Sequence, residues 1–301
     1  MWFKQLFVYR LPADFSLTAA QLEARLATRP LTALGAYDMQ RLGWLPPAPA
    51  ELGQGLVHSA QQQLLIALGI EQKLLPASVI RQAADERAAE LESTQGYPVG
   101  RKQMRDLKEM VADELRPRAF SHRRTTPVWI DLANQRLVID APSPARAEDV
   151  LTTLRETLDS FNAPPLTTRQ APRHAMTTWL ANGAAPRYFN IDDELELRAA
   201  NDTKICVRYT HHPLDGKEIK AHLKAGMNAT RLGLTWRDRV SFVLTDALQV
   251  KRIQFVGIGD DNVGTESGSP EERFENDFVL MTGELSLLLT DLTAALGGET
   301  E

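Results

Sequence analysis

The chain has 301 residues, of which 43% are hydrophobic and 24% are charged, a composition typical of a globular protein that can bury two or three cores without disulfides. The N-terminus has no small-residue cleavage site and no run of eighteen apolar residues occurs, which argues against a secreted or membrane-spanning protein. The single cysteine, Cys206, lies in an apolar run, so we expect a buried thiol in a reducing, cytoplasmic compartment.

The formal net charge of −5 conceals a strong segregation of charge along the chain. Residues 101–124 contain eight Lys and Arg against four acids, and residues 204–252 contain ten against four. The tail that begins at Val256 contains one base, Arg273, against eleven acids. Two basic segments on an otherwise acidic chain favour contact with a polyanion, although two solvated helix faces would have the same composition.

Residues 1–75 predict an N-terminal α+β unit. A helix capped by Thr18 would place Leu22 and Leu26 on one face. Strands are expected at residues 3–11, 31–45, 56–59 and 64–74. With one helix after the first strand, the order of elements is β-α-β-β-β.

Residues 76–125 predict a helical arm. Apolar residues at helical spacing indicate one helix after Pro76 and a second after the turn at residues 96–100. Two helices joined by a short turn form an αα-hairpin, which can project from a sheet. On the second helix Arg101, Arg105 and Lys108 recur at i, i+4 and i+7, so they form a basic stripe with Lys102 beside it.

The last part of the arm, at residues 116–124, places one large apolar ring, Phe120, among basic side chains. These side chains are Arg116, Arg118, His122, Arg123 and Arg124. One interpretation is a contact element in which Phe120 binds a partner subunit and the arginines bind an anion. The other is a basic loop whose Phe120 packs onto its own domain.

Two further regions complete the predicted α+β fold. Residues 126–165 predict a hairpin about Asn134 and Gln135 and a helix that starts at Pro144. Residues 166–301 predict a second α+β unit after a Pro- and Thr-rich linker, with a short helix capped by Thr177 and a leucine-rich terminal helix. Between those helices we expect a strand at 204–209, a helix at 217–225 and an antiparallel meander at 229–236, 240–244 and 250–255 with one solvated face. The order β-α-β-β-β therefore recurs, which favours antiparallel sheets in two similar units.

Motifs for catalysis and cofactors are absent from the sequence. It contains no GxxxxGK[ST] phosphate loop, no HExxH, no GxSxG and no CxxC pair. Gly257, Gly259 and Gly264 have the wrong spacing for a dinucleotide site. The adjacent His211 and His212 would point to opposite sides of an extended loop, which argues against a shared metal ion. We therefore expect no catalytic residue, no cofactor and no metal site.

Six segments in the same order resemble the RdgC family of recombination-associated proteins. They are MWFKQLFVYRL at the start, DMQRLGWLPP (38–47), KLLPASVI (73–80), ELRPRAF (114–120), WIDL (129–132) and FVLMTGEL (278–285). The resemblance extends over the whole chain, and several separate motifs in one order are more specific than a single short pattern.

The resemblance implies a cytoplasmic DNA-binding protein of the bacterial nucleoid without enzymatic activity, which forms a ring-shaped homodimer around duplex DNA. It implies binding with little sequence preference and restraint of the RecA recombinase through occupation of DNA. It also places Phe120 at a contact between paired arm tips, and it points the loop that carries Arg208, His211 and His212 into the ring. The charge of two histidines at that loop would depend on pH.

The candidate DNA-binding residues come from both basic segments. They are Arg101, Lys102, Arg105, Lys108, Arg116, Arg118, Arg123, Arg124, Arg208, His211, His212, Lys217, Lys220 and Lys224. Phosphate contacts from Lys and Arg supply affinity without sequence information, for duplex or single strand. Two alternatives remain: an enzyme that uses the arginines at 116–124 as an anion clamp, and a regulator whose arm binds a recombination protein rather than DNA.

Overall fold

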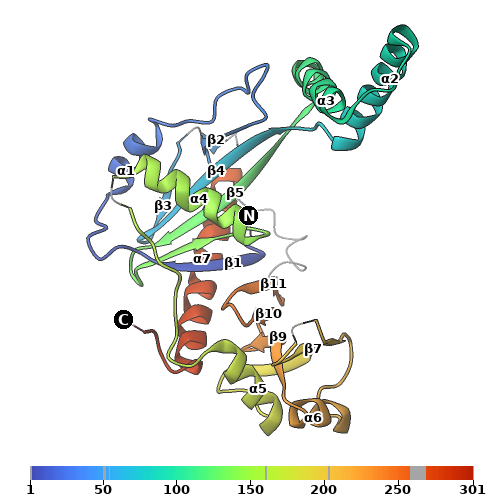
Figure 1. The fold of residues 1–301 in the computed structure, drawn as a ribbon. Coiled ribbons are helices and arrows are strands. Elements are labelled where there is room, and N and C mark those ends of the chain that lie inside the picture. Colours follow the sequence, from blue (N-terminus) through green and yellow to red (C-terminus); the bar gives the residue numbers. More distant parts are fainter. Residues whose placement is uncertain are drawn as a thin grey trace.

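The computed structural model describes residues 2–49, 52–53, 55–159, 161–202, 204–257 and 269–300 (Figure 1). Its centre is one antiparallel sheet of eleven strands in the order β2-β4-β5-β6-β1-β11-β10-β9-β7-β8, with β3 paired to β4 outside this path. The α+β class is therefore confirmed, but the two expected units share one continuous sheet. Most of the glycine-containing run at 257–264 lies outside the described residues.

Nineteen elements make up the described fold. The strands are β1 (Gln5–Arg10), β2 (Gln40–Leu45), β3 (His58–Ala60), β4 (Gln63–Lys73), β5 (Ser121–Asp131), β6 (Arg136–Ile139), β7 (Phe189–Ala199), β8 (Cys206–Tyr209), β9 (Met227–Trp236), β10 (Val240–Thr245) and β11 (Val250–Phe255). The helices are α1 (Ala19–Leu26), α2 (Ala77–Gln95), α3 (Arg101–Leu115), the 3-10 turn η2 (Arg116–Arg118), α4 (Pro144–Thr157), α5 (Pro172–Asn182), α6 (Lys217–Lys224) and α7 (Pro270–Ala295).

The N-terminal half of the sheet is covered on both faces. Residues Leu64 to Ile70 of β4 are buried without interruption, as expected for a strand between two layers. Ile66 packs in a cluster that includes residues of α1 and α4, whereas Leu65 packs in a second cluster with Leu285 of α7. Alternate side chains of one strand therefore enter two different cores.

The C-terminal half of the sheet is covered on one face by α5, α6 and α7. Leu232, Leu234 and Trp236 of β9 belong to the core beneath these helices. Arg231 and Thr235 alternate with them and are partly exposed. This confirms the predicted meander of β9, β10 and β11 with one solvated face. We call the uncovered side of β7 to β11 the open face.

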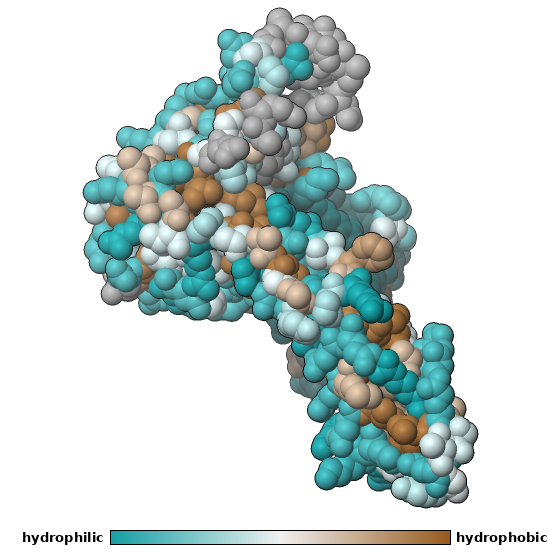
Figure 2. Space-filling model, turned by 90° about the horizontal axis from the view of Figure 1, so that it is seen from above, coloured by the Kyte–Doolittle hydropathy of each residue, from teal (hydrophilic) through white to brown (hydrophobic). Residues whose placement is uncertain are grey.

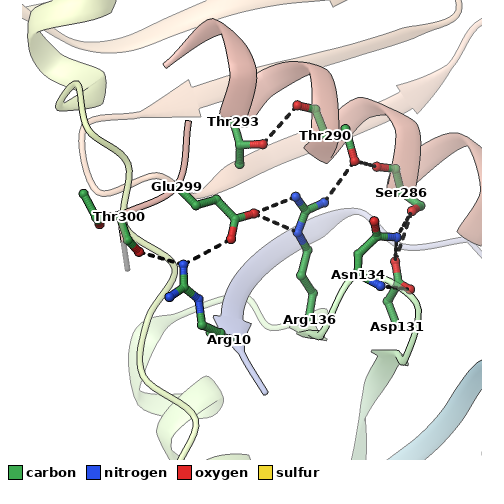
Figure 3. A network of polar contacts seen from close by, with 9 residues as sticks. All are labelled: Arg10, Asp131, Asn134, Arg136, Ser286, Thr290, Thr293, Glu299 and Thr300. Atoms are coloured by element: carbon green, nitrogen blue, oxygen red, sulfur yellow. Dashed lines mark hydrogen bonds and ion pairs between the residues drawn. The ribbon is translucent and has the colours of Figure 1, made fainter. Parts of the chain in front are cut away.

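Helix α7 connects the two halves. It begins at a capping box formed by Ser269 and Glu272, and nine of its residues are buried. By length and composition α7 could cross a membrane, but its apolar face is the core of this fold. In the N-terminal half, the Ser286 hydroxyl donates to Asp131 at 3.0 Å (Figure 3). In the C-terminal half, the indole N–H of Trp236 donates to Asp291 at 2.9 Å.

Beyond α7, the C-terminus is fixed by two arginines. Arg136, whose side chain is 7% exposed, donates from Nη2 to Oε1 of Glu299 at 2.7 Å (Figure 3). Arg10 donates from Nη2 to the backbone carbonyl of Thr300 at 2.6 Å. Both arginines lie on strands of the N-terminal half, so the end of the chain returns to the half in which the chain starts.

Several predicted elements are wrong in position. The expected strand at residues 31–45 covers only β2, and its first part is a loop that crosses close to Gly43. A Cβ atom at Gly43 would lie 2.5 Å from the backbone nitrogen of Leu31, so only glycine permits this approach. Helix α5 begins at Pro172 rather than at Thr177. Strand β7 was not predicted.

The repeat of two similar units is not reflected in the strand pairing. Strand β1 pairs with β6 and with β11, and it does not pair with β2, β3 or β4. In the C-terminal unit, by contrast, β9, β10 and β11 pair in sequence. The prediction of a buried Cys206 is also wrong, because the residue lies on the edge strand β8 and is exposed.

Candidate nucleic-acid interface

The predicted arm is an αα-hairpin of α2 and α3 that projects beyond the sheet (Figure 1). Arg87 of α2 and Glu114 of α3 form an ion pair across the hairpin, with Nη1 donating to Oε1 at 3.0 Å. The helices bury four residues: Ala84, Ala88, Leu107 and Val111. This contact leaves the opposite side of α3 facing solvent.

The basic stripe of α3 lies on that solvent side. Arg101, Lys102 and Arg105 are exposed, and Lys108 is half-buried. Nη2 of Arg105 lies 3.6 Å from its neighbour Asp106. Among the described residues, no ion pair engages Arg101, Lys102 or Lys108. These three cations are therefore available to an external anion.

The junction between α3 and β5 is built around the buried ammonium group of Lys73. Its Nζ donates to the backbone carbonyls of Arg116 at 2.6 Å and of Ala36 at 2.5 Å. These bonds tie the end of α3 to the loop before β2. Arg116 also pairs with Asp113 at 3.0 Å, whereas Arg118 is exposed and has no ion-pair partner in the described part of the chain.

Phe120 is 84% exposed, which contradicts the interpretation that it packs onto its own domain. Its backbone is fixed, because the Leu74 N–H donates to the Phe120 carbonyl at 2.7 Å. Phe120 lies between η2 and β5, at the base of the helical hairpin. The turn between α2 and α3, which is the far end of the hairpin, is at residues 96–100, so Phe120 is not at that end. The ring and the neighbouring Leu74, which is 51% exposed, offer an apolar contact at this junction.

Arg123 and Arg124 lie on strand β5 rather than in the expected loop. Nη2 of Arg123 lies 3.0 Å from Oε2 of Glu71, its cross-strand neighbour, and hydrogen bonds from Arg123 and Ser121 lower the pKa of Glu71. Arg124 is exposed and forms no ion pair with any of the described residues. Successive strand residues point to opposite faces, so the two arginines do not form one cluster.

The second basic segment centres on α6 and the loop before it. Lys217, Lys220 and Lys224 are exposed on α6, which is anchored by the buried Ile219. In the loop, Nδ1 of His211 lies 3.1 Å from a carboxylate oxygen of Asp193. Nδ1 of His212 lies 2.8 Å from the carbonyl of the next residue. The two histidines thus have different partners, and in the described residues no three metal-ligating side chains gather.

Arg208 is held on the open face by the buried carboxylate of Glu196. Oε2 of Glu196 accepts from Nε of Arg208 at 2.7 Å, and Oε1 accepts from Nε of Arg198 at 2.8 Å. The Thr230 hydroxyl donates to the same carboxylate at 3.0 Å. Burial alone would raise the pKa of Glu196, but these hydrogen bonds outweigh it and lower the pKa to about 2. Glu196 therefore stays ionised and orients the arginines.

The two basic segments lie at opposite ends of the molecule, with the arm at one end and α6 at the other (Figure 1). One chain does not bring them into one patch. Figure 2 shows a surface dominated by hydrophilic side chains, with hydrophobic ones in several separate patches. A ligand that contacts both segments must be extended.

Four basic residues that lie together on the open face were not among the candidates: Lys4, Arg231, Lys251 and Arg252. Arg231 and Lys251 follow the alternation of β9 and β11, placing them opposite the core, so a stricter use of that pattern could have identified them. Lys4 is brought to them by the pairing of β1 with β11, for which the sequence carries no signal.

Comparison with known proteins identifies relatives over the full length of the chain. A family model described as "Putative exonuclease, RdgC" matches residues 1–299. The chain is 46% identical over 301 residues to the recombination-associated protein RdgC of Janthinobacterium sp. (strain Marseille), covering 100% of this chain and 99% of that protein. It is 46% identical to the RdgC protein of Herminiimonas arsenicoxydans, covering 99% of each chain. For that of Dechloromonas aromatica (strain RCB), identity is 45%, with 99% and 98% covered.

Proposed function

Because the chain belongs to the RdgC family, we propose that it binds DNA without sequence preference and acts in recombination by occupying duplex. The observation that carries this proposal is a set of cations that form no ion pair among the described residues. These are Arg101, Lys102, Lys108, Arg118, Arg124, Lys217, Lys220 and Lys224. Phosphates of any sequence can replace the counterions of such side chains, which gives affinity without base recognition.

The separation of the two segments supports a homodimer that surrounds DNA. A two-fold dimer presents each segment twice, so the four surfaces would face a duplex from several sides. We propose that Phe120 contacts the partner subunit, because an exposed ring on a fixed backbone suits an interface anchor. A closed ring in the bacterial nucleoid would occupy DNA that the RecA recombinase requires. This function needs no enzymatic activity, no cofactor and no membrane.

The proposal is tested by measuring affinity for linear and closed circular duplex at several salt concentrations. Each neutralised phosphate should contribute about −0.9 to the slope of log affinity against log salt, so a steep slope is expected. A ring should also remain on closed circles longer than on linear duplex, from which it can slide. A flat salt dependence would overturn the proposal. Incubation of end-labelled duplex with Mg²⁺ tests the exonuclease in the family description, and we expect no shortening.

A further inference from the structure

A hollow of about 330 Å³ lies on the open face, where the first strand of the chain meets the C-terminal half of the sheet. Strand β1 pairs with β11 in the register Gln5 to Lys251, which brings Lys4 beside residues that are almost 250 positions away. Seven residues line the hollow: Lys4, Gln5, Glu194, Arg231, Val243, Lys251 and Arg252. Four of them are basic and one is acidic.

The single carboxylate in the hollow, that of Glu194, already forms an ion pair with Arg252. Both oxygens of Glu194 accept from Nη1 of Arg252, at 2.7 and 2.6 Å. Nε of Arg231 lies 3.9 Å from Glu196, a carboxylate that two other arginines contact more closely. Lys4 and Lys251 form no ion pair within the described part of the chain. The hollow therefore has an excess of positive charge.

Lys251 is affected first by burial and then by a neighbouring positive charge. Burial lowers the pKa of its ammonium group, and the charge of Arg231 lowers it further. Its Nζ lies 5.9 Å from the ring centroid of Phe7, so its surroundings on that side are apolar. Asp140, which does not line the hollow, accepts from the backbone N–H groups of Lys4 and Gln5 at 3.4 and 3.0 Å. An anion placed between Arg231 and Lys251 would relieve the repulsion between the two cations.

The hollow continues across the open face into a row in which two arginines flank the carboxylate of Glu196. Arg208, Glu196 and Arg231 are cross-strand neighbours on β8, β7 and β9. Five strand spacings separate β8 from β1, and at about 4.8 Å each they span about 24 Å. At about 3.4 Å per base pair, that length matches about seven base pairs of duplex. A row of this length suits a chain of phosphates better than a single ion.

We propose that the hollow binds a backbone phosphate of DNA through Arg231 and Lys251, as part of a contact surface that runs along the open face to Arg208. This inference rests on the proposed DNA-binding function and extends it to residues that were not among the predicted DNA contacts. Glu194 limits the affinity of the hollow, because its charge opposes that of the phosphate and holds Arg252.

The experiment compares duplex affinity of Arg231→Gln, Lys251→Gln and Glu194→Gln with that of the unchanged protein across a salt series. Each of the first two variants should bind roughly 3- to 10-fold more weakly at about 0.1 M salt, and the salt slope should fall by about 0.9 for each lost contact. Glu194→Gln should bind several-fold more tightly. Arg25→Gln on α1 is the control, since Arg25 is an exposed cation paired with Asp159 at 3.3 Å, far from the hollow in sequence and fold.

The outcomes separate this inference from the function on which it rests. If the unchanged protein binds duplex and the hollow variants bind equally well, the inference is overturned while the function stands. An equal loss in Arg25→Gln would also overturn it, because net charge would then explain the result. If the unchanged protein binds no duplex, both proposals are overturned. Calorimetric titration with inorganic phosphate tests whether the hollow binds a free ion instead of DNA. If Lys251→Gln loses phosphate binding but keeps its duplex affinity, the hollow is a site for free phosphate and the proposal is overturned.

Discussion

The two halves of the sheet carry their charges in different ways because different layers cover them. In the N-terminal half, helices lie on both faces, and β4 has seven consecutive buried residues. In the C-terminal half, one face is open, and Arg231 and polar side chains alternate with core residues along β9. A fully covered sheet has no room for a solvated cation, so the N-terminal half presents its candidate basic residues on the projecting arm and at the adjacent start of β5. The C-terminal half presents them on the sheet itself.

Truncation of a side chain within the double-covered half should have the largest effect. Ile66 is 0% exposed, and Ile66→Ala is expected to lower the free energy of unfolding by about 2–5 kcal/mol. Ser241→Ala on the open face should change it by less than about 0.5 kcal/mol. Urea unfolding of both variants measures the difference. Equal losses would contradict the contrast between the two halves.

The buried carboxylate of the open face should make stability depend on pH. Glu196 has a pKa of about 2 in the folded chain against an ordinary value of 4.5. The ionised carboxylate of Glu196 therefore stabilises the folded chain fully above about pH 4.5, and this stabilisation is lost as the pH falls through about 2. The loss in the free energy of unfolding is on the order of 3 kcal/mol. Unfolding of the unchanged protein and of Glu196→Gln between pH 5 and 2 tests this. Between pH 5 and 2 the variant should lose less stability than the unchanged protein. Parallel curves of stability against pH for the two proteins would contradict the low pKa of Glu196.

The arm junction should behave as a contact surface rather than as a core. Because Phe120 is 84% exposed, Phe120→Ala should leave the melting temperature unchanged. If the ring anchors a partner subunit, the variant should lose on the order of 2 kcal/mol at that contact and bind duplex more weakly. Melting temperature, molecular mass and duplex affinity are measured on the same variant. A lower melting temperature with normal duplex affinity would instead indicate that Phe120 packs in the core of its own chain.

The smallest effect on duplex affinity is expected from two adjacent arginines on β5, of which Arg123 already forms an ion pair. Arg124→Ala should weaken binding to unrelated duplexes by a similar factor, roughly tenfold or less, and should reduce the salt slope by about 0.9. Arg123→Ala should do less, since Glu71 already holds Arg123 at 3.0 Å. Gel shifts with duplexes of different sequence provide the measurement. A loss confined to one sequence would indicate base recognition instead.

Local patterns were sufficient for the arm hairpin, the turn at Asn134 and Gln135, and the meander of β9 to β11. Helical spacing and alternation depend on neighbours in the chain, and there the sequence is informative. Strand β7 was missed because Asp192, Asp193 and Glu194 interrupt its apolar alternation, and its pairing with β9 shifts register at that point. The position of Lys4 beside Lys251 depends on a pairing between opposite ends of the chain. No local pattern encodes such a contact.

The long sequence separation between β5 and α7 has a consequence for synthesis. Its residues complete a core that also contains Leu65 and Trp129, which lie on β4 and β5. At about 5–20 residues per second, the ribosome needs roughly 10–30 s to pass from β5 to the end of α7. During that interval one apolar face of the N-terminal half has no cover, so the nascent chain is in an aggregation-prone state. A message truncated before α7 would yield a product that never leaves that state.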